Sequence, residues 1–373
     1  MTLFPEDAAA PAPRQWSRTT VAGVSALAVA LVALLVLTFL PTSYVIQQQG
    51  PVVNTLGTAK DAEGEQVPLI SVAGAETYPT SGALDLTTVQ VRGSRDDTPS
   101  WFELATAWFD PSKAVVPIES VFPAGKTVEE RNEENTALMV DSQEEATAAA
   151  LLDLGYDVGA RVAVHGFSDD SAAEGILEVG DVVVAADGTP IETTQDLRDV
   201  INAGEGAPIT LEVERDGETV ETAVTPRRGV IDGEEVWLIG VTTMNEFVFP
   251  IDVTIQLDNI GGPSAGMMFA LGIIDTLTPG ELTGGEHIAG TGTIDAAGTV
   301  GPIGGIRQKM WGAQDAGAEI FLAPTANCGE VVGHVPDGLE VFAVETLDDA
   351  LEVLDTVRTE GDLTALPTCE PAA

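Results

Sequence analysis

Basic residues and histidine are scarce in this chain. Its 373 residues include only 16 Lys and Arg, three His and two Cys, whereas Asp and Glu number 59, so the formal net charge is -43 at pH 7. A surface of that sign repels phosphate backbones, which argues against nucleic acid as a partner held by charge attraction. The simplest interpretation of the charge is high solubility, including in salty surroundings.

The few histidines and cysteines also restrict the chemistry. His165, His287 and His334 do not share metal-ligand spacing with Cys328 and Cys369, so we expect no metal site and no other cofactor. Both cysteines lie late in the chain. In an exported segment an oxidising compartment would let Cys328 pair with Cys369 and tie the tail to the last domain, and two unrelated thiols are the alternative.

One long stretch has no charge at all. Residues 21–40 are apolar or small, and a helix of that length matches a hydrocarbon core of about 30 Å. We therefore predict a transmembrane helix. A cleaved signal peptide is the alternative, although its apolar region normally has only about 7 to 15 residues. Arg14 and Arg18 precede the stretch, whereas the next basic residue is Lys60, so the positive-inside tendency places residues 1–20 in the cytoplasm.

Residues 44–147 are predicted to form a β-rich segment on the exterior side. Within it, residues 83–91 alternate with the period of two that is typical of a half-buried strand. Residues 127–154 are rich in Glu, Ala and Leu and predict a helix. The run at 123–127 ends in Gly-Lys-Thr, like a phosphate-binding P-loop, but Ser120 stands where that loop requires glycine. We interpret the run as a turn and expect no ATPase in this chain.

Residues 148–228 form a distinct unit of short elements. Strands are expected at 161–164 and 209–215, and helices from Ser171 and over 194–203. The order of these elements, with the runs Gly-Asp-Val-Val, Asp-Gly-Thr-Pro and Asp-Leu, resembles the PDZ domains of bacterial exported proteases.

PDZ domains bind an extended peptide at a sheet edge and hold its C-terminal carboxylate with backbone N–H groups. The resemblance therefore implies peptide C-termini as partners. It places the capturing loop near residues 155–161, where the sequence is Gly-Tyr-Asp-Val-Gly followed by Ala and Arg. The negative charge of Asp157 in this loop disfavours a bound carboxylate. The resemblance therefore supports the PDZ fold more strongly than it supports the binding of a peptide C-terminus.

A serine lies at a predicted strand-to-helix turn. A strand is expected at 253–257, and the run Gly-Gly-Pro-Ser-Ala-Gly that ends at Gly266 opens an apolar helix. Ser264 would expose its hydroxyl there, while free backbone N–H groups and the positive helix end could stabilise an oxyanion. The spacing Gly-x-Ser-x-Gly also occurs at the nucleophile elbow of α/β hydrolases. A serine that merely caps a buried helix is a further alternative.

A serine nucleophile needs a base within hydrogen-bond reach, and Lys309 is the candidate. It lies on a predicted helix between the apolar residues Ile306 and Met310, and it is one of only four lysines in the chain. Burial disfavours the charged amine and lowers the pKa of lysine toward neutrality, which lets it accept a proton. A solvated lysine on a helix surface is the alternative.

Residues 258–270 and 291–310 together resemble the proteolytic domain of Lon proteases, in which Pro-Ser-Ala-Gly supplies the nucleophile and Gly-Gly-x-x-x-Lys the base. The resemblance extends over 235–357 and implies a fold like domain 2 of ribosomal protein S5. It implies that Ser264 is the nucleophile and Lys309 the dyad lysine. Three supporting positions follow from the same motifs: Thr291, which would orient the lysine, Ala265, and Gly262, which replaces the aspartate of many Lon proteins.

The combination of anchor, PDZ-like unit and Lon-like unit resembles the YlbL-type proteases of bacteria, which also share a Thr-Tyr-Pro-Thr-Ser-Gly run like residues 77–82. The resemblance implies an α+β protein with an N-terminal transmembrane helix, a β-rich segment, both domains and a tail at 358–373. It implies an ATP-independent serine endopeptidase that cleaves exterior or membrane-associated proteins. A single-pass topology in the cell membrane, with an extracellular catalytic part, and homo-oligomers are also expected.

Two other functions are left open by the sequence. A membrane-tethered PDZ adaptor with an inactive peptidase domain is suggested by Gly262 in place of the family aspartate. An α/β-hydrolase esterase would use His334 as the base for Ser264. Replacing His334 separates the esterase from the Lon-like enzyme, because only the esterase would lose its activity.

Overall fold

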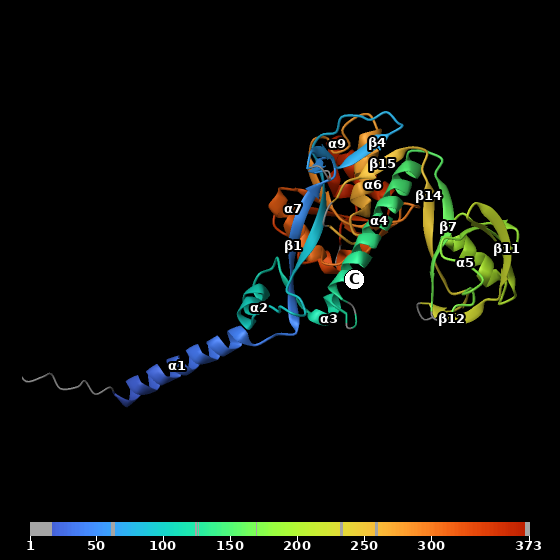
Figure 1. Ribbon diagram of the computed structural model, residues 1–373. Helices are drawn as coiled ribbons and strands as arrows, with labels where there is room; N and C mark the ends of the chain where they lie inside the picture. Colours follow the sequence, from blue (N-terminus) through green and yellow to red (C-terminus); the bar gives the residue numbers. More distant parts are fainter. Residues whose placement is uncertain are drawn as a thin grey trace, which may run out of the picture. The chain divides into compact units, whose positions relative to one another are not determined.

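The computed structural model describes residues 17–60, 64–123, 125, 127–168, 170–231, 234–257 and 260–369. The chain divides into two compact units (Figure 1). The smaller unit comprises Met1–Gln49 and Val89–Lys126, and the larger comprises Gly50–Thr88 and Thr127–Ala373. The strands β1 (Tyr44–Asn54) and β5 (Ala83–Arg92) each contribute residues to both units.

The smaller unit is built around one long apolar helix and two short ones. Its elements are α1 (Arg18–Phe39), α2 (Trp101–Trp108), β6 (Ala114–Pro117) and α3 (Ile118–Val121). The start of β1 pairs antiparallel with β6. Among the described residues, α1 is the one helix long and apolar enough to cross a membrane, and its apolar stretch is not buried by the rest of the protein. This is compatible with the predicted membrane anchor.

The larger unit contains a parallel sheet in which β5, β16 (His287–Gly290), β19 (Ile320–Pro324) and β20 (Glu340–Val344) follow one another. Alternate residues of β19 enter two cores, because successive side chains of a strand point to opposite faces. Ile320 and Leu322 join the core with α4 (Val128–Asp153), α6 (Gly266–Leu277) and α9 (Leu347–Arg358). Phe321 and Ala323 join the core with α7 (Ile306–Ala316). Both faces are therefore covered, as is usual for parallel strands.

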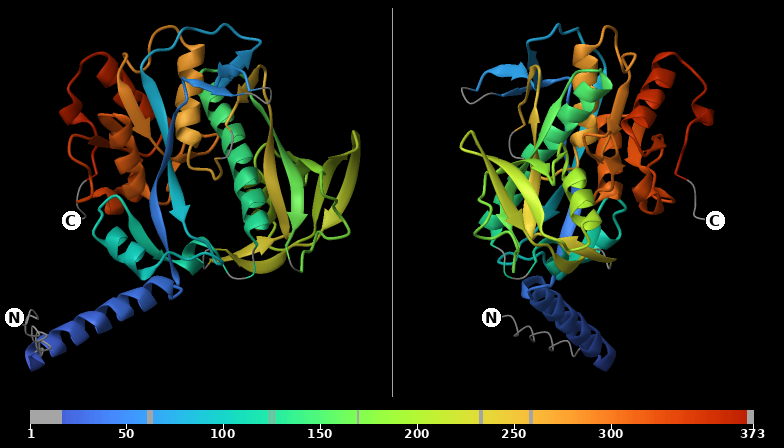
Figure 2. Two further views of the ribbon diagram at one scale, coloured as in Figure 1. Left: turned by 60° about the vertical axis from the view of Figure 1, so that its left-hand side comes forward. Right: turned by 90° about the vertical axis from the view of Figure 1, so that its right-hand side faces the viewer.

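The predicted β-rich segment contributes directly to this unit. The strand β5 pairs with β16, and β4 (Ile70–Ala73) pairs with β15 (Asp252–Ile255), the strand before Ser264. The predicted helix at 127–154 is confirmed as α4, which Thr127 begins with a capping box. Figures 1 and 2 show α4 alongside α6.

The remaining short elements of the larger unit complete the fold around this sheet. They are β2 (Thr58–Lys60), β3 (Gln66–Pro68), β17 (Thr293–Ile294), β18 (Val300–Gly301), a 3-10 turn at Thr325–Asn327, α8 (Cys328–Val331) and a 3-10 turn at Leu363–Ala365. The hairpin β17–β18 leads from the sheet toward α7.

A second sheet in the larger unit has the strand order β11-β10-β8-β7-β14. Its elements are β7 (Gly159–Phe167), β8 (Val182–Ala186), β9 (Thr189–Pro190), α5 (Thr194–Ala203), β10 (Ile209–Arg215), β11 (Glu218–Val224) and β14 (Val241–Val248), with the hairpin β12 (Arg227–Ile231) and β13 (Glu234–Leu238) beside it. The predicted helix at 194–203 and strand at 209–215 are confirmed residue for residue.

The helix expected from Ser171 is wrong. That segment forms turns and a short bridge between Glu174 and Leu177. The backbone N–H groups of Ala172 and Ala173 both donate to the carbonyl oxygen of Ile239, and the Ser171 hydroxyl donates to the same oxygen. Because these donors serve a distant loop, the local sequence could not reveal the outcome.

Candidate active site

Ser264 lies at the turn that opens α6. The apolar helix predicted after it is confirmed, and Ala265 is its buried N-cap residue. Gly262 has φ +92, a left-handed conformation that favours glycine, and its N–H donates to the carbonyl oxygen of Asn135 at 2.9 Å. At Gly266, a Cβ atom would lie 2.9 Å from the Ser142 hydroxyl oxygen. The start of α6 therefore approaches α4 closely. Asp258 and Asn259 of the predicted motif lie outside the described residues.

Lys309 reaches Ser264 from the first turns of α7. Its side-chain nitrogen, Nζ, lies 2.9 Å from the hydroxyl oxygen of Ser264 and 2.9 Å from that of Thr291. The side chain is only 2% exposed, and its helix neighbours Ile306 and Met310 are fully buried. This burial lowers the pKa of Lys309 to about 7, because low-dielectric surroundings disfavour the charged amine. The amine can therefore be neutral near physiological pH.

Thr291 fixes the backbone on which Ser264 stands. It follows β16 directly and is fully buried. Its hydroxyl donates to the carbonyl oxygen of Ser264 at 2.9 Å while it accepts from Lys309, and the N–H of Gly292 donates to the same carbonyl at 3.0 Å. One threonine thus connects the backbone of Ser264 to the Lys309 amine, which fixes the position of these two residues relative to each other.

The helix α4 contributes two side chains that sequence reasoning missed. Ser142, which is almost fully buried, donates to the carbonyl oxygen of Pro263 at 3.0 Å, directly before Ser264. The Glu145 carboxylate accepts from the N–H of Ala296 at 2.6 Å and from the amide of Asn245 at 3.4 Å. Burial is the main cause of its raised pKa. Their spacing of three residues puts both on one helix face, but nothing local identifies that face.

The other predicted residues are elsewhere. Cys328 and Cys369 form a disulfide, with Cα atoms 4.9 Å apart, and the bridge between Phe342 and Thr368 places the tail beside β20. The imidazole Nδ1 of His334 is 3.0 Å from the carbonyl oxygen of Val332. The Ser264 hydroxyl is therefore hydrogen-bonded to the amine of Lys309, whereas the His334 imidazole contacts a backbone carbonyl two residues before it.

The peptide-capturing loop expected near residues 155–161 stays a prediction. The strand after it, β7, pairs with β14 from Gly159 to Phe167 and with β8 at Val162 and Ala163. Among the described strands, β14 and β11 are the two ends of this sheet. The loop before β14 carries Gly240, and Thr243 and Asn245 on β14 both contact Thr194 at the start of α5.

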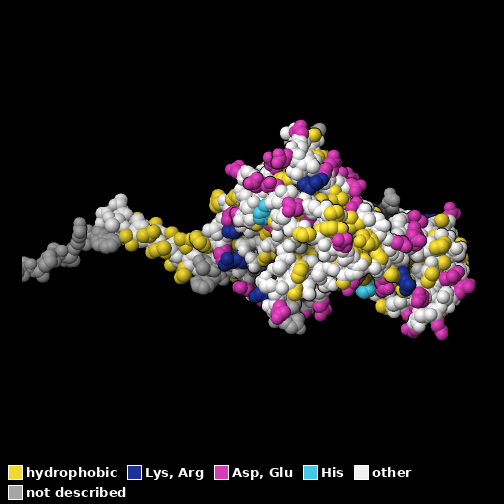
Figure 3. Space-filling model, turned by 90° about the horizontal axis from the view of Figure 1, so that it is seen from above, with side chains coloured by type: hydrophobic (Ala, Val, Ile, Leu, Met, Phe, Trp, Pro, Cys, Tyr) yellow, Lys and Arg dark blue, Asp and Glu magenta, His cyan; other side chains and the backbone are white. Residues whose placement is uncertain are grey.

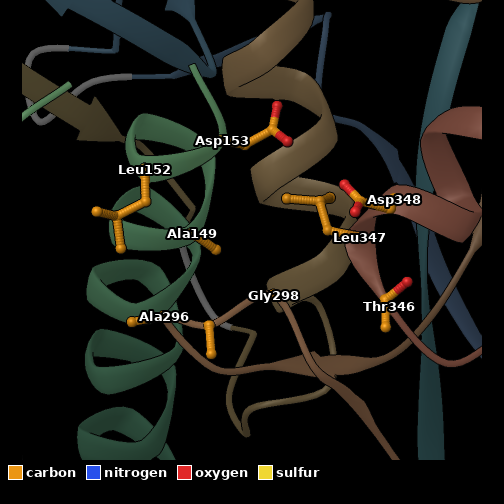
Figure 4. A pocket seen from close by; sticks show the side chains of 9 residues that line it. Ala149, Leu152, Asp153, Ala296, Gly298, Thr346, Leu347 and Asp348 are labelled. Carbon is orange, nitrogen blue, oxygen red and sulfur yellow. The ribbon is translucent and has the colours of Figure 1, made fainter. Parts of the chain in front are cut away.

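A cavity of about 350 Å³ is lined by residues of α4 and of the segment that opens α9 (Figure 4), and neither Ser264 nor Lys309 lines it. Its lining includes Asp153 at the end of α4 and Asp348 at the start of α9. Partial burial, followed by the charge of Asp348, raises the pKa of Asp153. None of the predicted site residues lines this cavity, and two neighbouring carboxylates make it unsuited to an anionic ligand.

Comparison with known proteins identifies both domains. Residues 258–356 match the Lon protease (S16) C-terminal proteolytic domain, and residues 133–225 match the PDZ domain. Lon protease 1 of Sorangium cellulosum is 40% identical over 93 residues, which are 24% of this chain and 11% of that protein. Lon protease 2 of Bacillus subtilis is 35% identical over 102 residues, 27% of this chain and 18% of that protein.

The chain is also similar to the PDZ domain of known structure from the SdrC-like protein of Listeria monocytogenes. The two are 22% identical, the matched region covers 22% of this chain and 85% of that chain, and the TM-score is 0.20. The chain spans less than a fifth of the length of the two Lon proteases named above. The matches to the two domain families show that the chain carries a Lon-type serine peptidase domain together with a PDZ domain.

Proposed function

We propose that this protein is an ATP-independent serine endopeptidase that uses Ser264 and Lys309 as a catalytic dyad. The observation that carries the proposal is the distance of 2.9 Å between the Lys309 amine and the Ser264 hydroxyl, in surroundings that lower the pKa of the amine to about 7. A base must be both near the proton it takes and neutral at the working pH. Lys309 meets both requirements.

The proposed reaction is acyl transfer in two steps. The neutral Lys309 amine takes the proton of Ser264, and the resulting alkoxide attacks the carbonyl carbon of a peptide bond. The C–N bond then breaks, and the protonated lysine returns the proton to the leaving amine. Water, deprotonated by the same lysine, hydrolyses the ester and frees Ser264. Backbone N–H groups at the start of α6 are expected to hold the oxyanion in both steps.

We infer independence from ATP because Ser120 stands where a P-loop ending in the Gly-Lys-Thr of the run at 123–127 would require glycine. Ala124 and Lys126 of this run lie outside the described residues. Hydrolysis of a peptide bond needs no nucleotide, because water is the final acyl acceptor. We expect ATP to be necessary only where a folded substrate must be unfolded first, so loosely folded proteins are the preferred substrates.

We propose that α1 anchors the enzyme in the cell membrane, with the catalytic domain on the extracellular side. The support is the apolar, unburied surface of α1 and the basic residues Arg14 and Arg18 at its start. Exterior and membrane-associated proteins would then be the substrates. Homo-oligomers are proposed from the resemblance to Lon proteases.

The PDZ domain is proposed to bind peptide or protein C-termini at the edge of β14. Asn245 on this strand contacts Glu145, and Glu145 accepts from Ala296 in the hairpin between Thr291 and Lys309. A peptide that adds to β14 would therefore act on a strand connected to the catalytic domain. This arrangement favours a regulatory role for the bound peptide over simple substrate capture.

An inactive adaptor is less well supported than the peptidase. It was suggested by Gly262 in place of an aspartate, but φ +92 at this position suits glycine and strains an aspartate. The contacts among Ser264, Lys309 and Thr291 involve no carboxylate. The dyad geometry is therefore complete without the family aspartate.

Hydrolysis of unfolded casein by the full chain in detergent, without ATP, tests the proposal. Ser264→Ala and Lys309→Ala should each abolish turnover, with a loss of about 10⁴-fold or more, because the two groups act as one unit. Lys113→Ala, which removes a half-buried lysine paired with Asp110, is the matched control and should retain activity.

Two further measurements separate the alternatives. His334→Ala should retain full activity, whereas an α/β-hydrolase mechanism predicts its loss. A fluorophosphonate probe should label the parent protein and not Ser264→Ala. Casein hydrolysis by Ser264→Ala at the parent's rate would overturn the dyad, and peptide binding by the parent without labelling or turnover would support the adaptor.

A further inference from the structure

The short helix α2 turns its largest apolar side chains outward. Phe102, Trp108 and Phe109, the residue that ends the helix, are 66%, 78% and 89% exposed, and Trp101 is also exposed. The buried residues of the helix are the smaller Leu104 and Ala107. A helix on a soluble surface normally buries its apolar stripe and exposes polar residues. Here, the aromatic side chains lie on the face that the protein does not cover.

The aromatic helix begins where the apolar helix α1 ends. Thr42, which follows α1, is buried, and its N–H donates to the hydroxyl of Thr98 at 3.2 Å. The Thr42 hydroxyl donates to the carbonyl oxygen of Pro99 at 2.9 Å, immediately before Ser100, the N-cap of α2. The two helices are in contact within the smaller unit (Figure 1). The start of α2 is therefore held at the exit of α1.

The charge of the chain is distributed in agreement with a membrane contact here. The smaller unit has six basic and seven acidic residues, whereas the larger has ten basic and 52 acidic residues. Near α2, Glu103 pairs with Arg92, and Asp110 pairs with Lys113. Figure 3 shows hydrophobic side chains along α1 and many acidic side chains elsewhere on the visible face. The smaller unit thus lacks the acidic excess that anionic lipid headgroups would repel.

We propose that α2 lies in the interface of the membrane that α1 crosses, with Trp101, Phe102, Trp108 and Phe109 inserted among the lipid headgroups. This rests on the proposed anchoring by α1. Tryptophan is enriched at this depth, because its ring is apolar and its N–H can stay hydrated. An interfacial helix buries its apolar face about 5–10 Å deep, which the four aromatic side chains suit. The lipid contact would fix the orientation of the smaller unit.

Tryptophan fluorescence of the full chain in phosphatidylcholine vesicles tests this placement. The vesicles contain lipids brominated on acyl-chain carbons near the headgroup, which quench tryptophan by contact. All proteins carry Trp16→Phe, so that the N-terminal tryptophan does not contribute. The parent should be quenched, and Trp101→Phe combined with Trp108→Phe should lose most of that quenching. Trp237→Phe is the matched control, because Trp237 lies under Arg228 beside the PDZ sheet, and it should leave the quenching unchanged.

Flotation with the vesicles is measured first on the same samples. A protein that does not float overturns the anchoring by α1 and with it this proposal, while casein hydrolysis reports separately on the dyad. A protein that floats, but whose quenching is the same with and without Trp101 and Trp108, overturns the interfacial placement alone. In that case a protein partner, and not lipid, would cover the aromatic face of α2. Loss of quenching in the double variant only, with unchanged flotation, is the result that supports the proposal.

Discussion

The turn at Ser264 and the edge of the PDZ sheet use their polar groups in opposite ways. At the turn, Thr291 and Lys309 are buried, and they bond to each other and to Ser264. Along β14, side chains are half-buried or exposed, and the strand ends its sheet among those the structure describes. In the first region, hydrogen bonds fix the positions of Ser264, Thr291 and Lys309 without any bound ligand. The second has backbone groups directed outward, which suits the addition of another strand.

One helix contacts both regions. Ser142 of α4 bonds to the residue before Ser264, and one turn further on Glu145 bonds to Asn245 of β14. A rigid helix that touches two sites can transmit a change at one to the other only if it has two arrangements. Three properties of the molecule can therefore be tested separately. They are the dependence of activity on a neutral Lys309, the support that α4 gives to the turn at Ser264, and the influence of β14 on that turn.

The largest expected effect is a change of kcat/KM with pH, which concerns Ser264 and Lys309 and not β14. Burial lowers the pKa of Lys309 to about 7, and only the neutral amine can accept the serine proton. kcat/KM should therefore rise with pH through about 7 and fall about tenfold per pH unit well below it, which makes activity at pH 5 about 100-fold lower than on the alkaline plateau and about 50-fold lower than at pH 7. Casein hydrolysis from pH 5 to 9 measures the profile. Peptide binding at β14 should not follow it, and a flat activity profile down to pH 5 contradicts the role of Lys309.

A smaller effect is expected where α4 supports the turn. Ser142→Ala removes the hydrogen bond to the Pro263 carbonyl and leaves that carbonyl without its donor. A loss of about 1–2 kcal/mol, or roughly 5- to 30-fold in kcat, is expected. KM should stay unchanged, because Ser142 positions Ser264 and does not bind substrate.

The matched control for this change is Thr136→Ala on the same helix, whose exposed hydroxyl bonds only to the carbonyl oxygen of Asn132 within α4. It should leave kcat unaltered. If Ser142→Ala lowered the melting temperature but left kcat and its pH profile intact, Ser142 would stabilise the fold without positioning the nucleophile.

The smallest effect concerns the link between the two regions. Asn245→Ala removes a 3.4 Å contact to Glu145 and one to Thr194. We expect basal hydrolysis to be unaltered and the change in rate caused by a peptide with a free C-terminus to shrink about two- to fivefold, at the low end of typical coupling energies. Thr219→Ala, on β11 at the opposite edge, is the control. Equal peptide responses in both variants would show that β14 does not transmit the signal through Asn245.

Much of the local structure followed from local patterns. The helix at 194–203 and the strand at 209–215 were predicted with their observed bounds, because period and turn residues are encoded within a few positions. The helix at 127–154 was predicted as well, but its partners were not. Ser142 meets a carbonyl 121 positions away, and helix periodicity carries no information about what lies opposite a given face.

The sequence by itself determined several of the elements, the family resemblances, and which serine and lysine to consider together. The tertiary structure alone decided that Lys309 is buried deeply enough to lower its pKa, that β7 is paired on both sides, and that the aromatic face of α2 is uncovered. The physical reason is the same in each case. Burial and strand pairing depend on segments brought together by packing, so no window of neighbouring residues contains them.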